Sequence, residues 1–320
     1  MSDMMTDSPV VTFALFAYNQ ERFIREAVEG AFSQTHERLE IILSDDCSTD
    51  RTFEIMTAMV SNYQGGHHVT LRRNKKNIGL ASHVNLVLEH SRGDIVLMAA
   101  GDDVSLPSRA AISVEIFRKN PKAMAVMLSA DVIDDNGDIV GRRLACGKKK
   151  REVTQNIDHL LSWRHATFGA TRAIRKSVFE EFGPLKADCP TEDTPFLMRS
   201  LICGDNILSP QKGVLYRRHN ANLSGVRSLL EMNVDAIYKQ YDHDVRRARK
   251  NGLLTGRSMD SLLSWMPRDR RVREIRLKIL SKTSVSFADI LFCSTHPAFS
   301  FKDKLNILVS FFCRFGAGKS

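Results

Sequence analysis

Three pairs of polar residues are of types that could bind a ligand. They are Tyr18 with Asn19, Asp45 with Asp46, and Asp102 with Asp103. Carboxylate oxygens are hard ligands that hold Mg²⁺ or Mn²⁺. A carboxylate can also accept the imide N–H of uracil, a donor that cytosine lacks. The pairs therefore indicate a site that could hold a divalent cation or the base of a nucleotide.

Hydrophobic periodicity predicts the elements that must carry these pairs. Continuous apolar runs alternate with helical patterns, and strands are expected at residues 10–17, 39–44, 69–72 and 95–100. This alternation predicts a mostly parallel sheet with helices on both faces. Each polar pair directly follows one of the strands. Ligands bind at the carboxyl ends of such strands, so the three pairs are expected to meet at one edge of the sheet.

The pattern changes after Pro107. Two apolar segments flank Asn136-Gly137, which predicts a β-hairpin over residues 124–143. A helix is expected over residues 192–203 and a further strand over residues 213–219. From about Ser228 the periodicity is helical only.

Three residues are expected to break the helical region into pieces: Gly252, Gly256 and Pro267. We therefore divide the chain into three parts. These are a disordered N-terminus (residues 1–9), an α/β domain (10–226) and a basic helical C-terminal region (227–320).

The composition is that of an ordinary globular protein, with 320 residues, 43% of them hydrophobic and 26% charged. The polar N-terminal residues do not resemble a signal peptide. The longest apolar runs fall short of the ~20 residues that span a bilayer. Six scattered cysteines without a CxxC pair argue against a zinc site or a disulfide framework. We expect a cytoplasmic protein.

The net charge of +9 lies in the C-terminal region. Residues 242–320 hold 16 Lys and Arg against 7 Asp and Glu, whereas the preceding residues are balanced. An anionic partner such as the inner face of the cell membrane would suit this region, which could form interfacial helices. A helical cap on the α/β domain is equally compatible with the periodicity. The sequence leaves both alternatives open.

Four segments, in order, resemble family 2 glycosyltransferases, which have the GT-A fold. They are FALFAYNQERFIREAVEGAFSQTHERLEIILSDDCSTDRT, NIGLASHVNLVLEHSRGDIVLMAAGDDVSLP, TEDTPFLMRSL and YRRHNANLSG. The resemblance covers residues 10–225. It implies a GT-A-like sheet and a metal-dependent enzyme that moves a sugar from a nucleotide-sugar to a hydroxyl acceptor with inversion. The acceptor would be a saccharide or a lipid-linked saccharide, as in bacterial surface-polysaccharide assembly.

The resemblance also implies roles for individual residues. Asp46 is the better of its pair to contact the base, and uracil suits it best. The residues implied in nucleotide binding are Ala17, Tyr18, Asn19, Asp45, Asp46, Lys76, Asn77, Gly79 and Asp102. Cys47 stands where the family usually has Gly, so a turn there with positive φ would be strained.

The metal ligands and the general base follow from the same resemblance. Asp103 would hold Mn²⁺ or Mg²⁺ through its hard carboxylate oxygens, with His219 completing the site. Arg217 and Arg218, beside His219, could contact phosphate. Asp193, or its neighbour Glu192, would remove the proton of the acceptor hydroxyl. Acids at a helix start are also favoured by the helix dipole, and Glu192 fits that structural role well.

Two other classes of protein remain as alternatives. A nucleotidyltransferase would also place acidic metal ligands on an α/β sheet, but it usually has a Gly-rich basic loop after the first strand, which this chain lacks. A non-catalytic module could bind a membrane or a polyanion through the basic region, and the intact acidic pairs argue against it. No nucleic-acid partner is expected.

Overall fold

In the computed structural model, the apolar runs of the first hundred residues form four parallel strands. They are β1 (Val11–Ala17), β2 (Leu39–Asp45), β3 (His68–Arg73) and β4 (Ile95–Ala100). β1 lies between β2 and β4, and β3 pairs with β2, in each case in parallel. β1 and β2 are buried on both faces, which explains why their sequences are continuously apolar. The predicted parallel arrangement is confirmed.

The structure describes residues 9–219, 222, 225–281, 283 and 285–316. They belong to two units, one formed by residues 1–157 and 166–219 and the other by residues 158–165 and 220–320. The expected disorder of residues 1–9 falls, apart from Pro9, outside the described residues. None of the described helices is both long and apolar enough to cross a membrane.

The rest of the first unit extends the sheet with mixed pairing. Its strands are β5 (Val104–Ser105), β6 (Ala123–Ile133), β7 (Ile139–Arg143), β8 (Val153–Gln155), β9 (Arg172–Arg175) and β10 (Asp205–Arg217). The order along the sheet is β3-β2-β1-β4-β9-β6-β10-β5. β9 runs antiparallel to both of its neighbours, whereas β6 and β10 are parallel. The predicted hairpin is confirmed, with β6 and β7 antiparallel and Gly137 at φ 89° in the turn.

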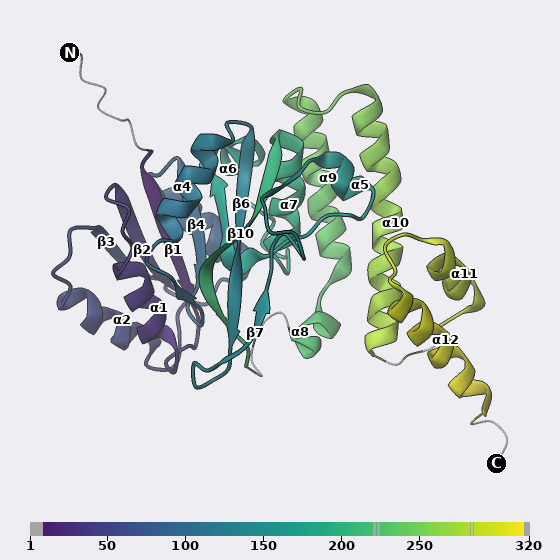
Figure 1. Cartoon of the computed structure of the whole chain (residues 1–320), viewed down its shortest axis with the longest axis horizontal. Coiled ribbons are helices and arrows are strands. Elements are labelled where there is room, and N and C mark those ends of the chain that lie inside the picture. Colours follow the sequence, from purple (N-terminus) through teal and green to yellow (C-terminus); the bar gives the residue numbers. More distant parts are fainter. Residues whose placement is uncertain (1–8, 220–221, 223–224, 282, 284, 317–320) are drawn as a thin grey trace. The chain divides into compact units, whose positions relative to one another are not determined.

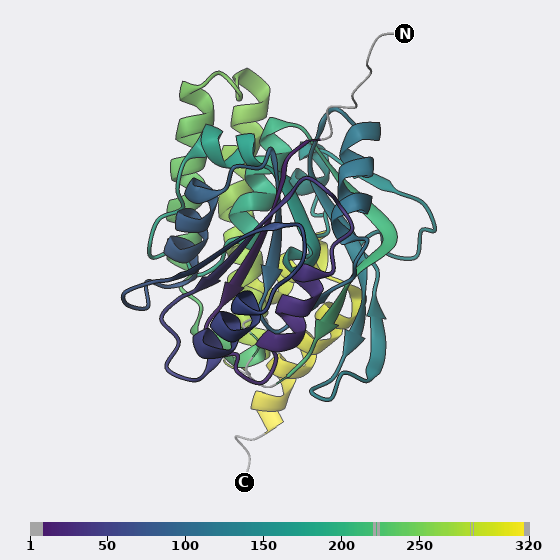
Figure 2. The same cartoon turned by 90° about the vertical axis from the view of Figure 1, so that its left-hand side faces the viewer.

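Helices cover both faces of this sheet (Figures 1 and 2). The face that includes Phe13 packs against α1 (Ile24–Phe32), α2 (Thr52–Ser61) and α4 (Arg109–Lys119). The face that includes Ala14 packs against α3 (Leu80–His90), α6 (Lys176–Phe182) and α7 (Asp193–Cys203). The 3₁₀ turn η1 (Gly169–Thr171) also belongs to this unit, whereas α5 (Ile157–Leu161), apart from Ile157, belongs to the second unit. The alternation of side chains along β1 thus supplies two separate cores.

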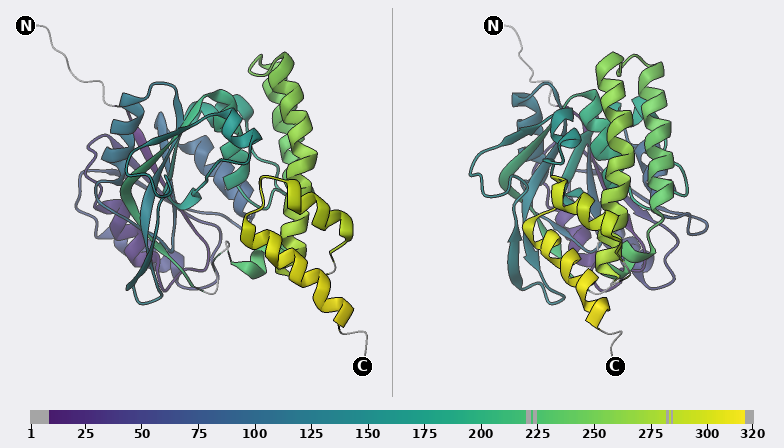
Figure 3. Two further views of the ribbon diagram at one scale, coloured as in Figure 1. Left: turned by 45° about the vertical axis from the view of Figure 1, so that its right-hand side comes forward. Right: turned by 90° about the vertical axis from the view of Figure 1, so that its right-hand side faces the viewer.

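The described part of the second unit is helical, as predicted. Its helices are α8 (Val226–Glu231), α9 (Val234–Lys250), α10 (Gly256–Leu280), α11 (Phe287–Thr295) and α12 (Phe301–Gly316). α9 and α10 lie side by side (Figure 3). Gly252 and Gly256 separate them as expected, both with positive φ, at 76° and 48°. A smaller core joins α10, α11 and α12 around Val272, Cys293 and Phe299.

The expectation that Pro267 breaks the helical region is wrong, because α10 continues through it. A proline inside a helix removes one N–H donor and leaves the carbonyl four residues earlier unpaired. That carbonyl belongs to Leu263, and both Leu263 and Pro267 are exposed, so water can satisfy it. The opposite face of α10 is anchored by Leu262 and Trp265, which are buried. Burial on one side therefore outweighs the local cost of the proline on the other.

Candidate active site

The carboxyl ends of β1, β2 and β4 are joined by backbone hydrogen bonds just beyond the strands. The N–H of Asp46 donates to the carbonyl of Ala17 at 2.9 Å, and the N–H of Gly101 donates to Phe16 at 2.9 Å. The two acidic pairs therefore follow β2 and β4, the strands on either side of β1. Tyr18 directly follows β1 itself. The expected convergence of the three polar pairs at one edge is what the fold produces.

Tyr18 and Asn19 form the turn that leaves β1. The Tyr18 side chain is 45% exposed, so its ring is free to contact a ligand. Asn19 adopts φ 52°, a conformation that Asn tolerates better than most residues. Its side-chain oxygen accepts the N–H of Thr49 at 2.8 Å, and its own N–H donates to the Ser48 hydroxyl at 2.9 Å. Asn19 thus ties the turn after β1 to the turn after β2.

Asp45 is completely buried, and its carboxylate holds the turn that follows β2. It accepts the N–H of Ser48 at 3.0 Å and forms an ion pair with Arg73 at 3.1 Å. The Ser48 hydroxyl donates to it as well. These interactions give Asp45 a structural function at the predicted nucleotide edge.

Asp46 organises the loop between β3 and α3. Its Oδ1 accepts hydrogen bonds from the Asn74 amide at 2.6 Å and the Ile78 N–H at 3.0 Å, and its Oδ2 accepts the Gly79 N–H at 3.0 Å. A carboxylate has about four lone-pair positions. One position on Oδ2 therefore remains for a further donor such as a base imide.

The loop that Asp46 anchors carries the other predicted nucleotide-binding residues. Lys76 and Asn77 are exposed, and Gly79 has φ 79°. Gly79 begins α3, and its positive φ explains why a residue without a side chain occupies this position.

Cys47 has the positive φ that the sequence comparison with the family suggested, at 63°. A non-glycine residue in this region is strained by roughly 1–2 kcal/mol. The turn after β2 has therefore kept its shape despite the cysteine. Cys47 and the other described cysteines at positions 146, 189, 203 and 293 are free thiols.

The second acidic pair meets the end of β10. The carboxylate of Asp103 accepts the backbone N–H of Arg217 at 2.8 Å. The imidazole Nε2 of His219 lies 2.9 Å from Oδ2 of Asp102. His219 is thus brought to this pair as predicted, although its contact is with Asp102 and not with Asp103. Its ring also packs against Phe23, with the ring centroids 4.9 Å apart.

The expectation that Arg217 contacts phosphate is not supported, because its side chain is completely buried. The guanidinium donates to the carbonyls of Asp102 and Asp134 at 3.0 Å each, and it pairs with Glu26 at 2.8 Å. These donors are used inside the protein. Arg217 therefore fixes the backbone around the acidic pair instead of reaching a ligand.

Burial, followed by the neighbouring charge of Asp102, raises the pKa of Asp103 well above its usual range. Arg109, on the first turn of α4, is also buried, and burial lowers the pKa of its guanidinium to about 10. Two adjacent carboxylates in such surroundings are a favourable environment for a cation.

The donor set of this pair fits Mg²⁺ or Mn²⁺. Asp102 and Asp103 offer hard oxygen atoms, and the His219 imidazole suits manganese. Within the described residues, no group of three or more His, Cys, Asp and Glu side chains is arranged to hold a metal ion. Phosphate oxygens of a substrate would therefore have to complete the coordination, as is usual for Mg²⁺ sites of this kind.

Asp193 is the first residue of α7, and Glu192 precedes it at the N-cap position. The side chain of Asp193 is 36% exposed, and its Oδ1 accepts a hydrogen bond from buried Arg172 at 3.0 Å. A Cβ on Gly169 would lie 1.8 Å from the same oxygen, so only glycine fits beside it. Asp193 is thus held between η1 and β9 with part of its carboxylate open to solvent.

Glu192 behaves differently from its neighbour. Burial and the adjacent charge of Asp193 raise the pKa of Glu192 to about 8. A glutamate with this pKa is mostly protonated at neutral pH. Asp193 therefore remains the better proton acceptor of the two.

Buried arginines connect the two acidic regions. Arg109 donates to the carbonyl of Met98 at 2.6 Å and to that of Arg172 at 3.3 Å. The positive charge of Arg109 partly offsets the rise in the pKa of Asp103. Arg172 donates the hydrogen bond that holds Asp193. The motifs in the sequence gave no indication of Arg109 and Arg172. An arginine next to small and apolar residues, as in GATRAI, is the one signal that could have drawn attention to a buried position.

A comparison with protein families agrees with this geometry. Residues 12–183, which carry β1 without Val11, β2 to β9, both acidic pairs and Arg172, match the family model described as "Glycosyl transferase family 2". The chain belongs to glycosyltransferase family 2.

This family 2 glycosyltransferase has several similar proteins in bacteria. It is 34% identical to EpsE of Bacillus subtilis, a protein named as a candidate glycosyltransferase, over 133 residues, which are 42% of this chain and 47% of EpsE. It is 29% identical to the chondroitin synthase of Escherichia coli over 132 residues, 41% of this chain and 19% of that enzyme. The chain therefore spans only part of the length of these relatives.

Solved structures share the fold of this family 2 glycosyltransferase. Residues 1–349 of S. aureus TarS in complex with UDP-GlcNAc superpose with a TM-score of 0.58 at 16% identity, covering 96% of this chain and 92% of that TarS chain. The mannosyltransferase PcManGT of Pyrobaculum calidifontis, in complex with GDP-Man and Mn²⁺, gives a TM-score of 0.57 at 15% identity, covering 98% and 87%. At these identities the likeness shows a GT-A-type fold.

Proposed function

We propose that the chain transfers a sugar from a UDP-sugar to a hydroxyl group of a saccharide or lipid-linked saccharide, with inversion at the anomeric carbon. The observation that carries this proposal is the meeting of Tyr18, Asp46 and the Asp102–Asp103 pair at the carboxyl ends of adjacent strands, linked by 2.9 Å backbone hydrogen bonds. Ligands of open α/β sheets bind at this edge. The similar structures of TarS and PcManGT contain nucleotide-sugars.

We assign base recognition to Tyr18 and Asp46. The exposed ring of Tyr18 can stack on a pyrimidine, a contact that every base can make. The remaining lone pair of Asp46 can accept the imide N–H of uracil, and this contact selects uracil over cytosine. Asn19, Asp45 and Gly79 keep the surrounding turns in shape. Lys76 and Asn77, both exposed, are available to the phosphates.

Asp102 and Asp103, with His219 beside them, would hold Mn²⁺ or Mg²⁺. When bound, the ion neutralises the negative charge that develops on the departing diphosphate. Within the protein, Arg217 keeps the Asp103 carboxylate in place through its backbone N–H at 2.8 Å. The Asp102–His219 contact at 2.9 Å orients the imidazole. These contacts preorganise the acidic pair before a substrate arrives.

We assign the general base to Asp193. Its partly exposed carboxylate accepts the proton of the acceptor hydroxyl as the hydroxyl oxygen attacks the anomeric carbon. The bond to the diphosphate oxygen breaks in the same step, so the configuration at that carbon inverts. Arg172 keeps the carboxylate oriented, and Glu192, protonated at neutral pH, adds no second negative charge.

We further propose that α11 and α12 touch an anionic membrane, where a lipid-linked acceptor would be found. Phe287 and Phe301 are 71% and 84% exposed, and Lys302 lies beside the second. Exposed aromatic rings flanked by lysines are typical of interfacial helices. Co-sedimentation should therefore occur with vesicles containing phosphatidylglycerol and weaken in Phe287→Ser/Phe301→Ser. Equal binding of this variant would refute the contact.

Donor hydrolysis followed by proton NMR tests the proposed reaction without knowledge of the acceptor. Water can replace the acceptor slowly in a transferase, and the anomer first released reports the stereochemistry. With Mn²⁺ we expect one UDP-sugar of a panel to be hydrolysed with inversion, and GDP-mannose to be left intact. First release of the retained anomer would overturn the single-displacement mechanism. Hydrolysis of a GDP-sugar alone would overturn the assignment of Asp46.

A further inference from the structure

A cavity of about 400 Å³ opens on the second unit, and none of its lining residues has been assigned a function above. It is lined by Trp163, which follows α5, and by one face of α10 that includes Trp265. Arg257, Asp260, Ser264 and Arg268 supply its polar lining. These positions recur at helical spacing along α10. The cavity therefore combines aromatic rings with a row of polar groups.

Both tryptophans of the chain line this one cavity. Trp163 has φ 54°, which is rare for a bulky residue and strains the backbone by about 1–3 kcal/mol. Its indole N–H donates to the buried carboxylate of Asp269 at 3.3 Å. Asp269 in turn accepts the Tyr238 hydroxyl at 2.6 Å and Arg273 Nε at 3.0 Å. The Trp163 ring is thus fixed by a buried network despite the backbone strain.

Four polar side chains that α10 contributes to the cavity are exposed to solvent and are therefore open to a ligand. Among the described residues, no hydrogen bond or ion pair is made by the side chains of Arg257, Asp260, Ser264 or Arg268. Trp265 is 3% exposed, and its indole N–H is buried without an acceptor. Buried donors are normally satisfied, so one that is left over calls for a ligand or water. The guanidinium, hydroxyl and carboxylate groups on the exposed face of α10 are therefore available together to a ligand.

We propose that this cavity binds a saccharide unit of the acceptor glycan, which rests on the transferase function proposed above. A sugar ring has an apolar face of C–H groups that packs on an indole, and hydroxyl groups around its rim that require both donors and acceptors. Arginine and serine donate, and Asp260 accepts. Ligand sites commonly combine a mostly apolar wall with a few placed polar groups in this way.

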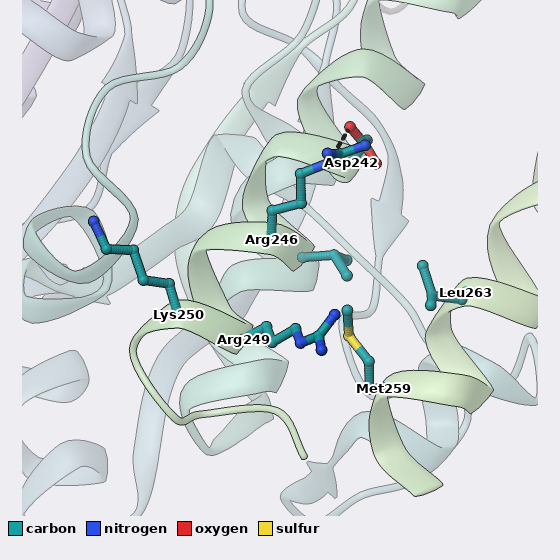
Figure 4. Close-up of a pocket in the computed structure, with 7 residues that line it drawn as sticks. Asp242, Arg246, Arg249, Lys250, Met259 and Leu263 are labelled. Atoms are coloured by element: carbon teal, nitrogen blue, oxygen red, sulfur yellow. Dashed lines mark hydrogen bonds and ion pairs between the residues drawn. The ribbon is translucent and has the colours of Figure 1, made fainter. Parts of the chain in front are cut away.

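A second cavity of about 520 Å³ lies between α9 and α10, and its lining is less suited to binding a sugar (Figure 4). Its side chains include Arg249, Lys250, Met259 and Leu263, and its Arg246 already pairs with Asp242 at 2.8 Å. It has no aromatic ring to receive a sugar face. A variant in this second cavity therefore serves as the matched control for variants in the proposed saccharide cavity.

Tryptophan fluorescence of the full chain tests the proposal, because both tryptophans lie at the cavity. The probes are cellohexaose, chitohexaose, and chondroitin and hyaluronan hexasaccharides, each titrated without nucleotide or metal. We expect at least one to change the emission saturably, with a dissociation constant of about 1 mM or tighter. Arg268→Ala and Asp260→Ala keep both rings, and each should weaken binding about ten-fold. Arg249→Ala in the control cavity should leave it unchanged.

Two results would overturn the proposal. The first is that none of the four oligosaccharides changes the tryptophan emission. The second is a change that is equal in the native chain, Arg268→Ala and Asp260→Ala, since the lining would then be irrelevant. Circular dichroism establishes that the variants are folded. Because no donor is present, failure here leaves the transferase assignment untouched, and failure of donor hydrolysis leaves this binding measurement valid.

Discussion

Three arginines with 0–1% exposure control the acidic residues of the site. Arg217 holds Asp103 and Asp102, Arg172 holds Asp193, and Arg109 lies between them. Buried guanidinium groups need partners for their donors, and most of these donors meet carbonyls and carboxylates at 2.6–3.3 Å, although Nε of Arg109 is buried without a partner among the described residues. The Asp193 carboxylate is held by a buried guanidinium, whereas Arg217 holds Asp103 through its backbone N–H and Asp102 through the carbonyl of that residue.

At the residue scale, Asp193→Asn should abolish turnover and leave nucleotide binding intact. The amide is nearly isosteric with the carboxylate but cannot accept a proton. A general base is worth about 10²–10⁴-fold in rate, so turnover should fall by at least that range, measured as donor consumption with calorimetry of UDP in parallel. Asp188→Asn, an exposed acid nearby, is the control. Normal turnover in Asp193→Asn would mean that another group is the base.

Glu192→Gln should change how stability depends on pH. The pKa of Glu192 is raised from 4.5 to about 8, so between these values the native state binds more protons than the unfolded state. The free energy of unfolding therefore falls as pH rises through this window. The glutamine, which resembles the protonated form, should remove this loss. Because Glu192 is partly exposed, we expect a gain of only about 1–2 kcal/mol at pH 8 and above.

Thermal unfolding of Glu192→Gln and the native chain across pH 5 to pH 9 measures this effect. The two curves should agree near pH 5 and separate as pH rises. Parallel curves over the whole range would show that Glu192 has an ordinary pKa in the folded protein.

At the scale of elements, the short turn η1 positions the general base. Gly169 begins this turn, and its missing side chain leaves the space that the Asp193 carboxylate occupies. Gly169→Ala should push the carboxylate aside. Misplacing a catalytic group by about 1 Å can cost 10²-fold in rate, so turnover should drop by about that factor while UDP binding persists.

Gly66→Ala is the matched control for this turn, because a Cβ at Gly66 meets nothing within 4 Å. It should leave turnover and stability nearly unchanged. If Gly169→Ala kept full activity, Asp193 would not need its present position, and its assignment as the base would lose its support.

Elements differ in how far the sequence predicts them. β1, β2 and β4 were predictable because strands buried on both faces are continuously apolar. β10 was predicted only from residue 213, although it begins at Asp205, because Pro210, Gln211 and Lys212 interrupt the apolar pattern where the strand is irregular. β9 was missed because its four residues, RAIR, include two arginines. Arginine is usually exposed, so its burial here has no local signal.

The residues of the candidate site also differ in how far the sequence predicts them. The acidic pairs were predictable because they follow apolar strands at the ligand-binding edge of a parallel sheet. Their partners were not, since Arg172 and Arg217 reach the acids from strands that are distant in sequence. The contact of His219 with Asp102 instead of Asp103 depends on the position of the β10 end, which tertiary packing determines.

At the scale of the molecule, the two units have different charges and different proposed ligands. The first, with its acidic edge, would take the donor, and the second, with most of the +9 net charge, carries the saccharide cavity and the exposed rings of α11 and α12. Association with anionic vesicles through surface lysines should weaken as salt rises, because the Debye length falls to about 3 Å at 1 M. Donor binding at the buried acidic pair should depend on salt much less.

Calorimetric titration of UDP, GDP, CDP and dTDP, with Mn²⁺ and again with EDTA, tests the proposed donor site most directly. We expect UDP to bind with Mn²⁺ and to lose most of its affinity in EDTA, and Asp103→Asn to bind poorly under both conditions. CDP should bind weakly, because cytosine lacks the imide N–H that Asp46 accepts, whereas dTDP, whose thymine has the same imide as uracil, should bind. Binding of no nucleotide under any condition would contradict the assignment of this edge as a nucleotide-sugar site.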